Sequence, residues 1–291
     1  MSIWFLLTLF LASTLIALCY WGAGIVLYPP KMSQLEIFPE QFGLRYEKVS
    51  FKTSDGVTLR GWFIRGENSQ GRTLLMCHGW GDNKGELLGL THFLAADFDL
   101  FYFDNRSHGE SEGHFCTLGF HELKDFDAAM DFLRARKPEC LARLGVFGLS
   151  MGAAIACVAV PQHPEIKAAV LESPFTDYRQ VVRQYTWNHF KLPHFPFVWL
   201  TLWMLRLRVG DPNVDDYRPI QHVAQIAPRP ILVIGGSADD LMREADVRAL
   251  YAAASQPKQL WIVPDAGHAE CHEIAGLEYE TRVANFLNKH L

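Results

Sequence analysis

The sequence has few cysteines, no excess of positive charge and no low-complexity tract. Its 6 cysteines in 291 residues include no Cys-x-x-Cys pair, which excludes a disulfide scaffold and a zinc ribbon. The 27 lysines and arginines are outnumbered by 32 aspartates and glutamates, so no basic field is available to hold a nucleic-acid backbone. Hydrophobic residues make up 49% of the chain, enough for a sizeable core. We therefore expect a globular protein that does not bind nucleic acid.

An uncharged stretch from Ile3 to Tyr28 is rich in leucine, isoleucine and phenylalanine. As a helix it is long enough to cross about 30 Å of hydrocarbon, and it lacks the basic start and the cleavage site of a secretory signal. We predict a transmembrane anchor over residues 1–30 that contacts membrane lipid; an apolar helix docked on the domain is the alternative. Lys31, Arg45 and Lys48 follow the stretch and no basic residue precedes it, which favours a cytoplasmic catalytic domain.

After a connector over residues 31–45, residues 46–291 are expected to form one domain. It begins with a β-hairpin around Asp55-Gly56. Short apolar runs typical of strands buried on both faces follow, separated by helical periods such as His121–Arg136. This alternation predicts an α/β fold with a mostly parallel central sheet and helices on both faces. The runs cover residues 73–77, 100–103, 144–149, 168–171, 231–234 and 259–263.

The third of these runs ends in Gly148-Leu149-Ser150-Met151-Gly152, followed by a helix of small residues. A serine on so sharp a strand-to-helix turn projects its hydroxyl into a cleft, and the flanking glycines let neighbouring chain pass close by. Ser150 is therefore a candidate nucleophile. The backbone N–H groups of Met151 and of Trp80, which follows the first run, are candidate donors to an oxyanion.

A serine nucleophile needs a base to take its proton and an acid to orient that base. Asp239 and Asp240 follow the strand expected at 231–234, and His268 follows the strand expected at 259–263. The order serine, aspartate, histidine is that of a catalytic triad on a strand-turn-helix nucleophile. His268 is the candidate base, and either aspartate could orient it.

Further motifs are Cys77-His78-Gly79-Trp80-Gly81, Asp104-Asn105-Arg106, Glu172-Ser173-Pro174-Phe175 and Ala266-Gly267-His268. With them, residues 46–291 resemble serine hydrolases of the α/β-hydrolase superfamily, in the branch with lysophospholipase-like, esterase-like and serine aminopeptidase-like members. The resemblance implies that Ser150 attacks, that His268 is general base and then acid, and that Asp239 rather than Asp240 orients it. Ser107 departs from the pattern, because this branch usually has glycine there.

The competing motifs for a metal or cofactor are incomplete. His268 and His272 lie four residues apart, but no His-Glu-x-x-His is present and no Pro-Cys-x-x-Cys follows. The glycine-rich stretch 79–85 lacks the Gly-Lys-Ser/Thr of a phosphate-binding loop. We expect neither a cofactor nor a metal.

A segment at about residues 174–227 interrupts the alternation and is expected to form a helical cap. Its part Pro193–Leu205 is rich in aromatic residues and has no acidic group. These rings pack on the domain, line a pocket for an acyl chain, or enter the bilayer beside the anchor. The expected substrate is a small-molecule ester or thioester with an apolar portion. A serine peptidase and a catalytically silent membrane-bound scaffold are the alternatives.

Overall fold

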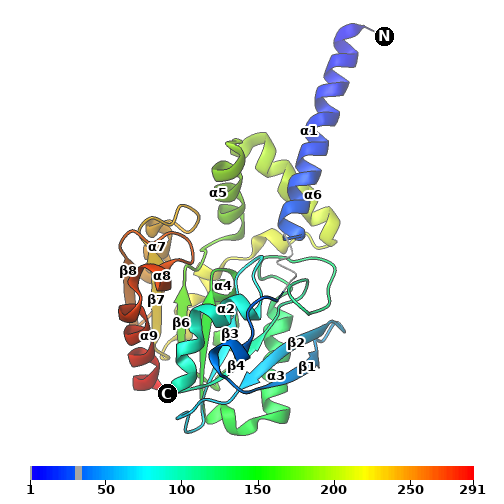
Figure 1. The fold of residues 1–291 in the computed structure, drawn as a ribbon. Coiled ribbons are helices and arrows are strands. Elements are labelled where there is room, and N and C mark those ends of the chain that lie inside the picture. Colours follow the sequence, from blue (N-terminus) through cyan, green and yellow to red (C-terminus); the bar gives the residue numbers. More distant parts are fainter. Residues whose placement is uncertain (1, 30–34) are drawn as a thin grey trace.

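The computed structural model describes residues 2–29 and 35–291 and has an eight-stranded sheet at its centre (Figure 1). The strands lie in the order β1-β2-β4-β3-β5-β6-β7-β8. The first three in this order are antiparallel neighbours and the others are parallel, so the predicted mostly parallel α/β fold is confirmed. The strands are β1 (Tyr46–Lys52), β2 (Thr58–Ile64), β3 (Arg72–Cys77), β4 (Asp99–Phe103), β5 (Arg143–Leu149), β6 (Ile166–Glu172), β7 (Ile231–Gly236) and β8 (Lys258–Val263).

Helices cover both faces of the sheet. The core on one face includes residues of α3, α4 and α7, and the core on the other face includes residues of α2, α8 and α9. Val146 of β5 belongs to the first core and its neighbour Phe147 to the second. Since successive strand residues point to opposite faces, the uninterrupted apolar runs are what a doubly covered sheet requires. These helices are α2 (Lys84–Thr91), α3 (Leu123–Arg136), α4 (Met151–Ala159), α7 (Glu244–Ala253), α8 (Cys271–Ala275) and α9 (Leu277–His290).

The carboxyl ends of the central parallel strands meet at one edge of the sheet. Cys77 of β3 pairs with Gly148 of β5, and Leu149 pairs with Glu172 at the end of β6. Loops that leave these strands therefore converge above the same edge, where binding sites form in open α/β sheets. A cap between β6 and β7 lies above this edge and contains α5 (Tyr178–Phe190) and α6 (Trp199–Val209).

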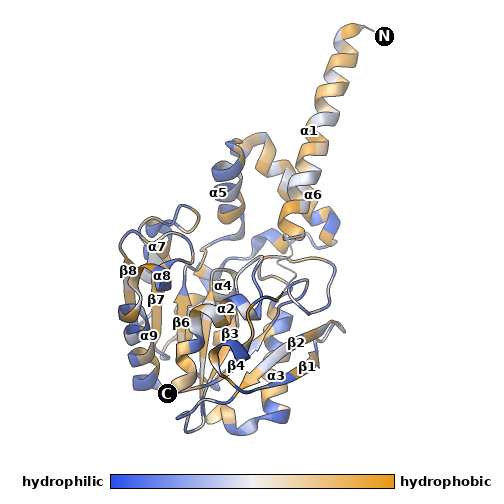
Figure 2. Cartoon of the chain, viewed as in Figure 1, coloured by the Kyte–Doolittle hydropathy of each residue, from blue (hydrophilic) through white to orange (hydrophobic). Residues whose placement is uncertain are grey.

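Helix α1 (Ile3–Leu27) projects away from the domain, with its C-terminal end beside α6 (Figure 1). It is apolar along its length (Figure 2) and, within the described ranges, is the one helix long and apolar enough to cross a membrane. Its last residue precedes Tyr28 and Pro29, as expected from the proline. The expected connector over residues 31–45 begins within residues 30–34, which lie outside the described residues; its described part includes a 3-10 helix at Pro39–Phe42.

Candidate active site

Ser150 lies on the turn between β5 and α4, in a conformation that a serine rarely adopts. Its φ is +53° and its ψ is −112°, so the surrounding structure must hold the backbone in place. A Cβ added to Gly152 would lie 2.1 Å from the carbonyl oxygen of Cys77, and one added to Gly148 would lie 2.6 Å from that of Gly152. The close approach of β3 and α4 to this turn thus requires glycine on both sides of the serine.

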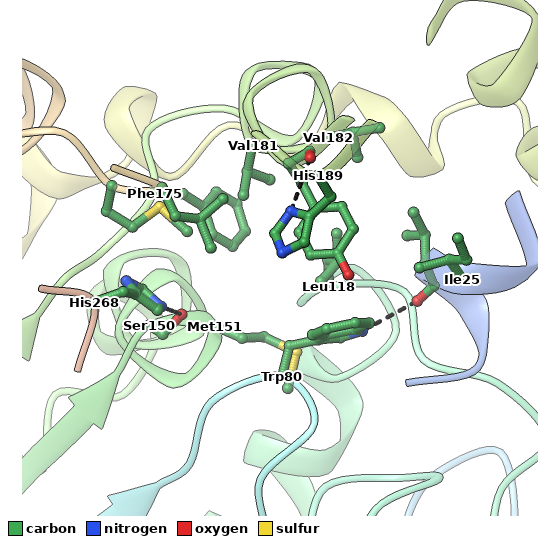
Figure 3. A pocket seen from close by; sticks show the side chains of 14 residues that line it. Ile25, Trp80, Leu118, Ser150, Met151, Phe175, Val181, Val182, His189 and His268 are labelled. Atoms are coloured by element: carbon green, nitrogen blue, oxygen red, sulfur yellow. Dashed lines mark hydrogen bonds between the residues drawn. The ribbon is translucent and has the colours of Figure 1, made fainter. Parts of the chain in front are cut away.

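The side chains of Asp239, His268 and Ser150 form a chain of hydrogen bonds. His268 Nδ1 lies 2.8 Å from Oδ2 of Asp239, and His268 Nε2 lies 3.0 Å from Oγ of Ser150 (Figure 3 shows the latter contact). With the proton on Nδ1, the ring donates to the carboxylate and accepts from the serine hydroxyl. This is the arrangement in which an imidazole can withdraw the hydroxyl proton.

The two candidate aspartates occupy different positions. Asp239 is buried, and its second oxygen accepts the backbone N–H groups of Leu241 at 2.9 Å and Met242 at 2.7 Å. Asp240 is exposed, and its carbonyl oxygen accepts the side-chain amide of Asn188. The structure therefore brings Asp239, and not Asp240, to His268.

The charges around His268 act on its proton affinity. Burial alone would lower the pKa of His268, but the hydrogen bond and the negative charge of Asp239, with smaller contributions from Asp82 and Glu172, raise the pKa above its ordinary value. Burial acts on Asp239 in the opposite sense, and the bond and charge of His268 together with the two backbone donors lower the pKa of its carboxyl. The pair is thus arranged to stabilise an imidazolium beside a carboxylate.

The predicted oxyanion donors flank the serine. Met151 is the first residue of α4, so its backbone N–H is one of the unpaired groups at a helix N-terminus. Trp80 belongs to the loop after β3, and this loop reaches Ser150: a Cβ added to Gly79 would lie 3.5 Å from Cβ of Ser150. Both residues line the same cavity as Ser150 and His268 (Figure 3).

His78 orders the loop that carries Trp80. Its Nδ1 lies 2.7 Å from the carbonyl oxygen of Gly79, and its Nε2 accepts the backbone N–H of Asn105 at 2.9 Å. Burial, aided by the charges of His108 and Lys84, lowers the pKa of His78 and keeps the ring neutral. With both ring nitrogens engaged, His78 holds the loop and is not placed as a base.

The cavity above Ser150 has a volume of about 260 Å³ and is lined almost entirely by apolar side chains. No acidic residue and no lysine or arginine is among the described residues that line it. The lining residues are Ile25, Val26, Trp80, Leu118, Ser150, Met151, Phe175, Val181, Val182, Tyr185, His189, Leu241, Met242 and His268.

Two of these residues, Ile25 and Val26, belong to α1. The indole Nε1–H of Trp80 donates to the carbonyl oxygen of Val26 at 3.2 Å (Figure 3), and the backbone N–H of Cys116 donates to that of Leu27 at 2.8 Å. These bonds satisfy carbonyl groups that the C-terminus of a helix leaves unpaired. Sequence patterns do not indicate this role, because Ile25 and Val26 lie in a stretch that is apolar on all sides.

Within the described ranges, no group of three or more histidine, cysteine, aspartate or glutamate side chains is placed to hold a metal ion. His272, four residues after His268, lies 3.2 Å from a carboxylate oxygen of Glu280 and stacks on Phe93. His268 and His272 therefore have separate partners in the structure.

A family model described as "Serine aminopeptidase, S33" matches residues 68–215, just over half of the chain. The chain belongs to this family. The match includes the turn that carries Ser150 and the loop that carries Trp80. Taken with the fold, it establishes that this S33-family chain is a hydrolase of the α/β-hydrolase superfamily.

Similarities to individual proteins agree with the family assignment. The S33-family chain is 31% identical to the uncharacterized protein Rv2307c of Mycobacterium tuberculosis over 83% of its length and 79% of that protein. It is 27% identical to the "alpha/beta hydrolase domain-containing protein WAV2" of Arabidopsis thaliana, over 87% and 82% of the two chains. Among solved structures it is similar to the esterase Pf2001 of Pyrococcus furiosus, with a TM-score of 0.76, 26% identity, and coverage of 91% and 98%.

Proposed function

We propose that the protein hydrolyses carboxylic esters or thioesters with an apolar acyl portion, through an acyl-enzyme on Ser150. The observation that carries the proposal is the hydrogen-bonded chain from Asp239 through His268 to Ser150, which opens on an apolar cavity. The similarity to an esterase supports the same reaction class.

In the proposed mechanism, His268 Nε2 takes the proton of the Ser150 hydroxyl as the oxygen attacks the acyl carbon. The oxyanion that forms accepts the backbone N–H groups of Met151 and Trp80; a donor of this kind stabilises the intermediate by about 3–4 kcal/mol in acyl transfer. His268 then gives its proton to the departing alkoxide or thiolate. Water, activated by the same imidazole, releases the acid and restores Ser150.

The lining of the cavity favours an ester over a peptide. An aminopeptidase must hold the protonated amino terminus of its substrate, which calls for a carboxylate near the reacting bond. The described lining residues include none. We infer that peptidase activity, which the family's description suggests, is the second candidate function. Assays with ester and peptide substrates distinguish it from esterase activity.

Labelling with a fluorophosphonate tests the mechanism, because this reagent forms a covalent bond only with an activated serine. The full chain in detergent micelles should label, and the Ser150→Ala variant should not. p-Nitrophenyl esters of increasing chain length should then be cleaved faster than aminoacyl p-nitroanilides. A chain that fails to label is the silent scaffold, and faster cleavage of the anilides identifies a peptidase.

We further propose that α1 anchors the protein in a membrane, with the hydrolase domain on the cytoplasmic side. The length and composition of α1 support the anchor, and the basic residues that follow it support the orientation. The full chain should remain in the membrane pellet after alkaline carbonate extraction. In sealed vesicles of known orientation, protease should reach the domain only from the cytoplasmic side.

A further inference from the structure

Helix α1 has two parts with different surroundings. From Ile3 to Leu18 its side chains are mostly exposed, whereas Cys19, Ala23 and Val26 are buried. The buried side packs on α6, where a Cβ added to Gly22 would lie 3.3 Å from Oγ1 of Thr201. The last third of the helix is therefore part of the hydrolase domain, and the first two thirds extend beyond it (Figure 1).

The exposed part is too short to span a bilayer alone. A helix over residues 3–18 is about 24 Å long at 1.5 Å per residue, while the hydrocarbon core is about 30 Å thick. If α1 crosses the membrane, the docked part must also enter it and bring α6 with it. The cap suits this position, because Phe195, Trp199 and Trp203 are 72%, 55% and 44% exposed, and they belong to α6 and to the segment before it, both of which contact α1.

A second cavity, of about 70 Å³, lies between α1, α5 and α6 at this level. It shares Ile25, Val26, Val182 and Tyr185 with the cavity above Ser150. Away from Ser150 it extends to the exposed rings of Trp21 and Phe190 and to Leu18, and the described residues that line it carry no charge. The two cavities thus adjoin each other at the four shared side chains, and their apolar linings extend from the exposed surface of α1 to Ser150.

We propose that the substrate is a single-chain acyl ester resident in the bilayer, and that its acyl chain reaches Ser150 laterally through the gap between α1 and α5. The proposal deepens the function proposed above and rests on it. Transfer of an acyl chain from lipid into water becomes more costly with each methylene, and a route that begins within the membrane avoids that transfer. We take the small volume of the outer cavity, about 70 Å³, to favour the passage of one acyl chain at a time.

The outer cavity can be filled without touching the catalytic residues. Thr186 of α5 lines the outer cavity only, and its hydroxyl donates to the carbonyl oxygen of Val182 in its own helix. Thr186→Trp places a large side chain in the route. Arg183→Trp is the matched control, because Arg183 is exposed on the same helix and lines neither cavity.

The full chain is reconstituted in phosphatidylcholine vesicles and given two substrates with one leaving group, p-nitrophenyl palmitate within the bilayer and p-nitrophenyl acetate in the water. Thr186→Trp should lower kcat/KM for the palmitate at least tenfold and change that for the acetate less than twofold. Arg183→Trp should change neither.

An unchanged palmitate rate in Thr186→Trp, or an equal loss on both substrates in a variant that still folds, overturns the lateral route. If Thr186→Trp fails to fold, Thr186→Leu is used instead; it fills less space and should show a smaller loss confined to the palmitate. If Thr186→Leu shows no loss specific to the palmitate, the lateral route is refuted. Failure of the proposed function is a different result: the unaltered chain would then cleave neither ester.

Discussion

Asp239→Asn is the most direct test of the proposed hydrogen-bonded chain from Asp239 through His268 to Ser150. The asparagine keeps an oxygen for the backbone N–H groups of Leu241 and Met242, so the loop after β7 should hold its shape. Its amide can donate to Nδ1 of His268, which moves the ring proton to Nε2. That nitrogen then donates instead of accepting, and it cannot take the proton of Ser150.

The expected loss of activity is large because His268 then carries its proton on the wrong ring nitrogen, although the positions of the side chains are kept. The same exchange in a serine protease lowers kcat by about 10⁴-fold, or about 5.5 kcal/mol, and we expect a similar loss here. Asp240→Asn is the matched control, since Asp240 is exposed and contributes only a backbone carbonyl. It should retain activity within about twofold of the unaltered chain.

The pH profile supplies a second readout. His268 acts as a base only when neutral, and Asp239 holds its pKa above the ordinary value, so activity should fall as the pH drops through that raised pKa. Removing the carboxylate charge lowers the pKa of His268, so the acidic limb of the residual activity should move to lower pH. The assay is kcat/KM for p-nitrophenyl butyrate from pH 4 to 9. The assignment of Asp239 as the residue that orients His268 would be refuted by equal losses of activity in Asp239→Asn and Asp240→Asn. It would also be refuted if the acidic limb of the pH profile did not move in Asp239→Asn.

Two further variants test the supports of the site. Gly152→Ala places a Cβ against the carbonyl of Cys77, so fluorophosphonate labelling should fall at least about 100-fold, and near-normal labelling would show that the turn can relax. Nζ of Lys84 lies 2.5 Å from Oδ2 of Asp104 and both side chains are fully buried, so Lys84→Met leaves the carboxylate of Asp104 buried without its cation. The free energy of unfolding in urea should drop by about 3–5 kcal/mol, with partial recovery in Lys84→Met/Asp104→Asn; a change below about 1 kcal/mol would contradict the buried pair.

Much of the fold was predictable because its central strands are buried on both faces. The run at 259–263, also expected to be buried on both faces, instead lies in the edge strand β8, where most side chains are only half-buried. The runs at 144–149 and 231–234 are apolar without alternation, and a parallel sheet covered by two layers of helices is the arrangement that uses them. Element boundaries were less certain. The helix expected from His121 begins at Leu123, because the carboxylate of Glu122 accepts the backbone N–H groups of Thr117 and Gly119 and so closes the preceding loop.

Local sequence motifs predicted the parts of the site that depend on neighbouring residues, but not the contacts between distant loops. Ser107 shows why the related proteins favour glycine there: its φ is +63°, a conformation that glycine adopts without cost. The choice between Asp239 and Asp240 depends on which carboxylate faces a loop 29 residues further along the chain. The residues alone left both open, and the resemblance to the family favoured Asp239. In the structure, Asp239 contacts His268 and is held by the backbone N–H groups of Leu241 and Met242, in agreement with that choice.

The role of α1 in the site could not be read from the sequence, because burial in lipid and burial in protein select the same side chains. Leu18, which is exposed beyond the docked part of the helix, and Val26, which lines the cavity above Ser150, are both apolar. The carbonyl of Val26 nevertheless accepts the indole of Trp80, whose backbone N–H is a proposed oxyanion donor. The helix proposed to anchor the protein in a bilayer therefore also holds the loop beside Ser150. Removing it should disturb catalysis on soluble esters as well as attachment to the membrane.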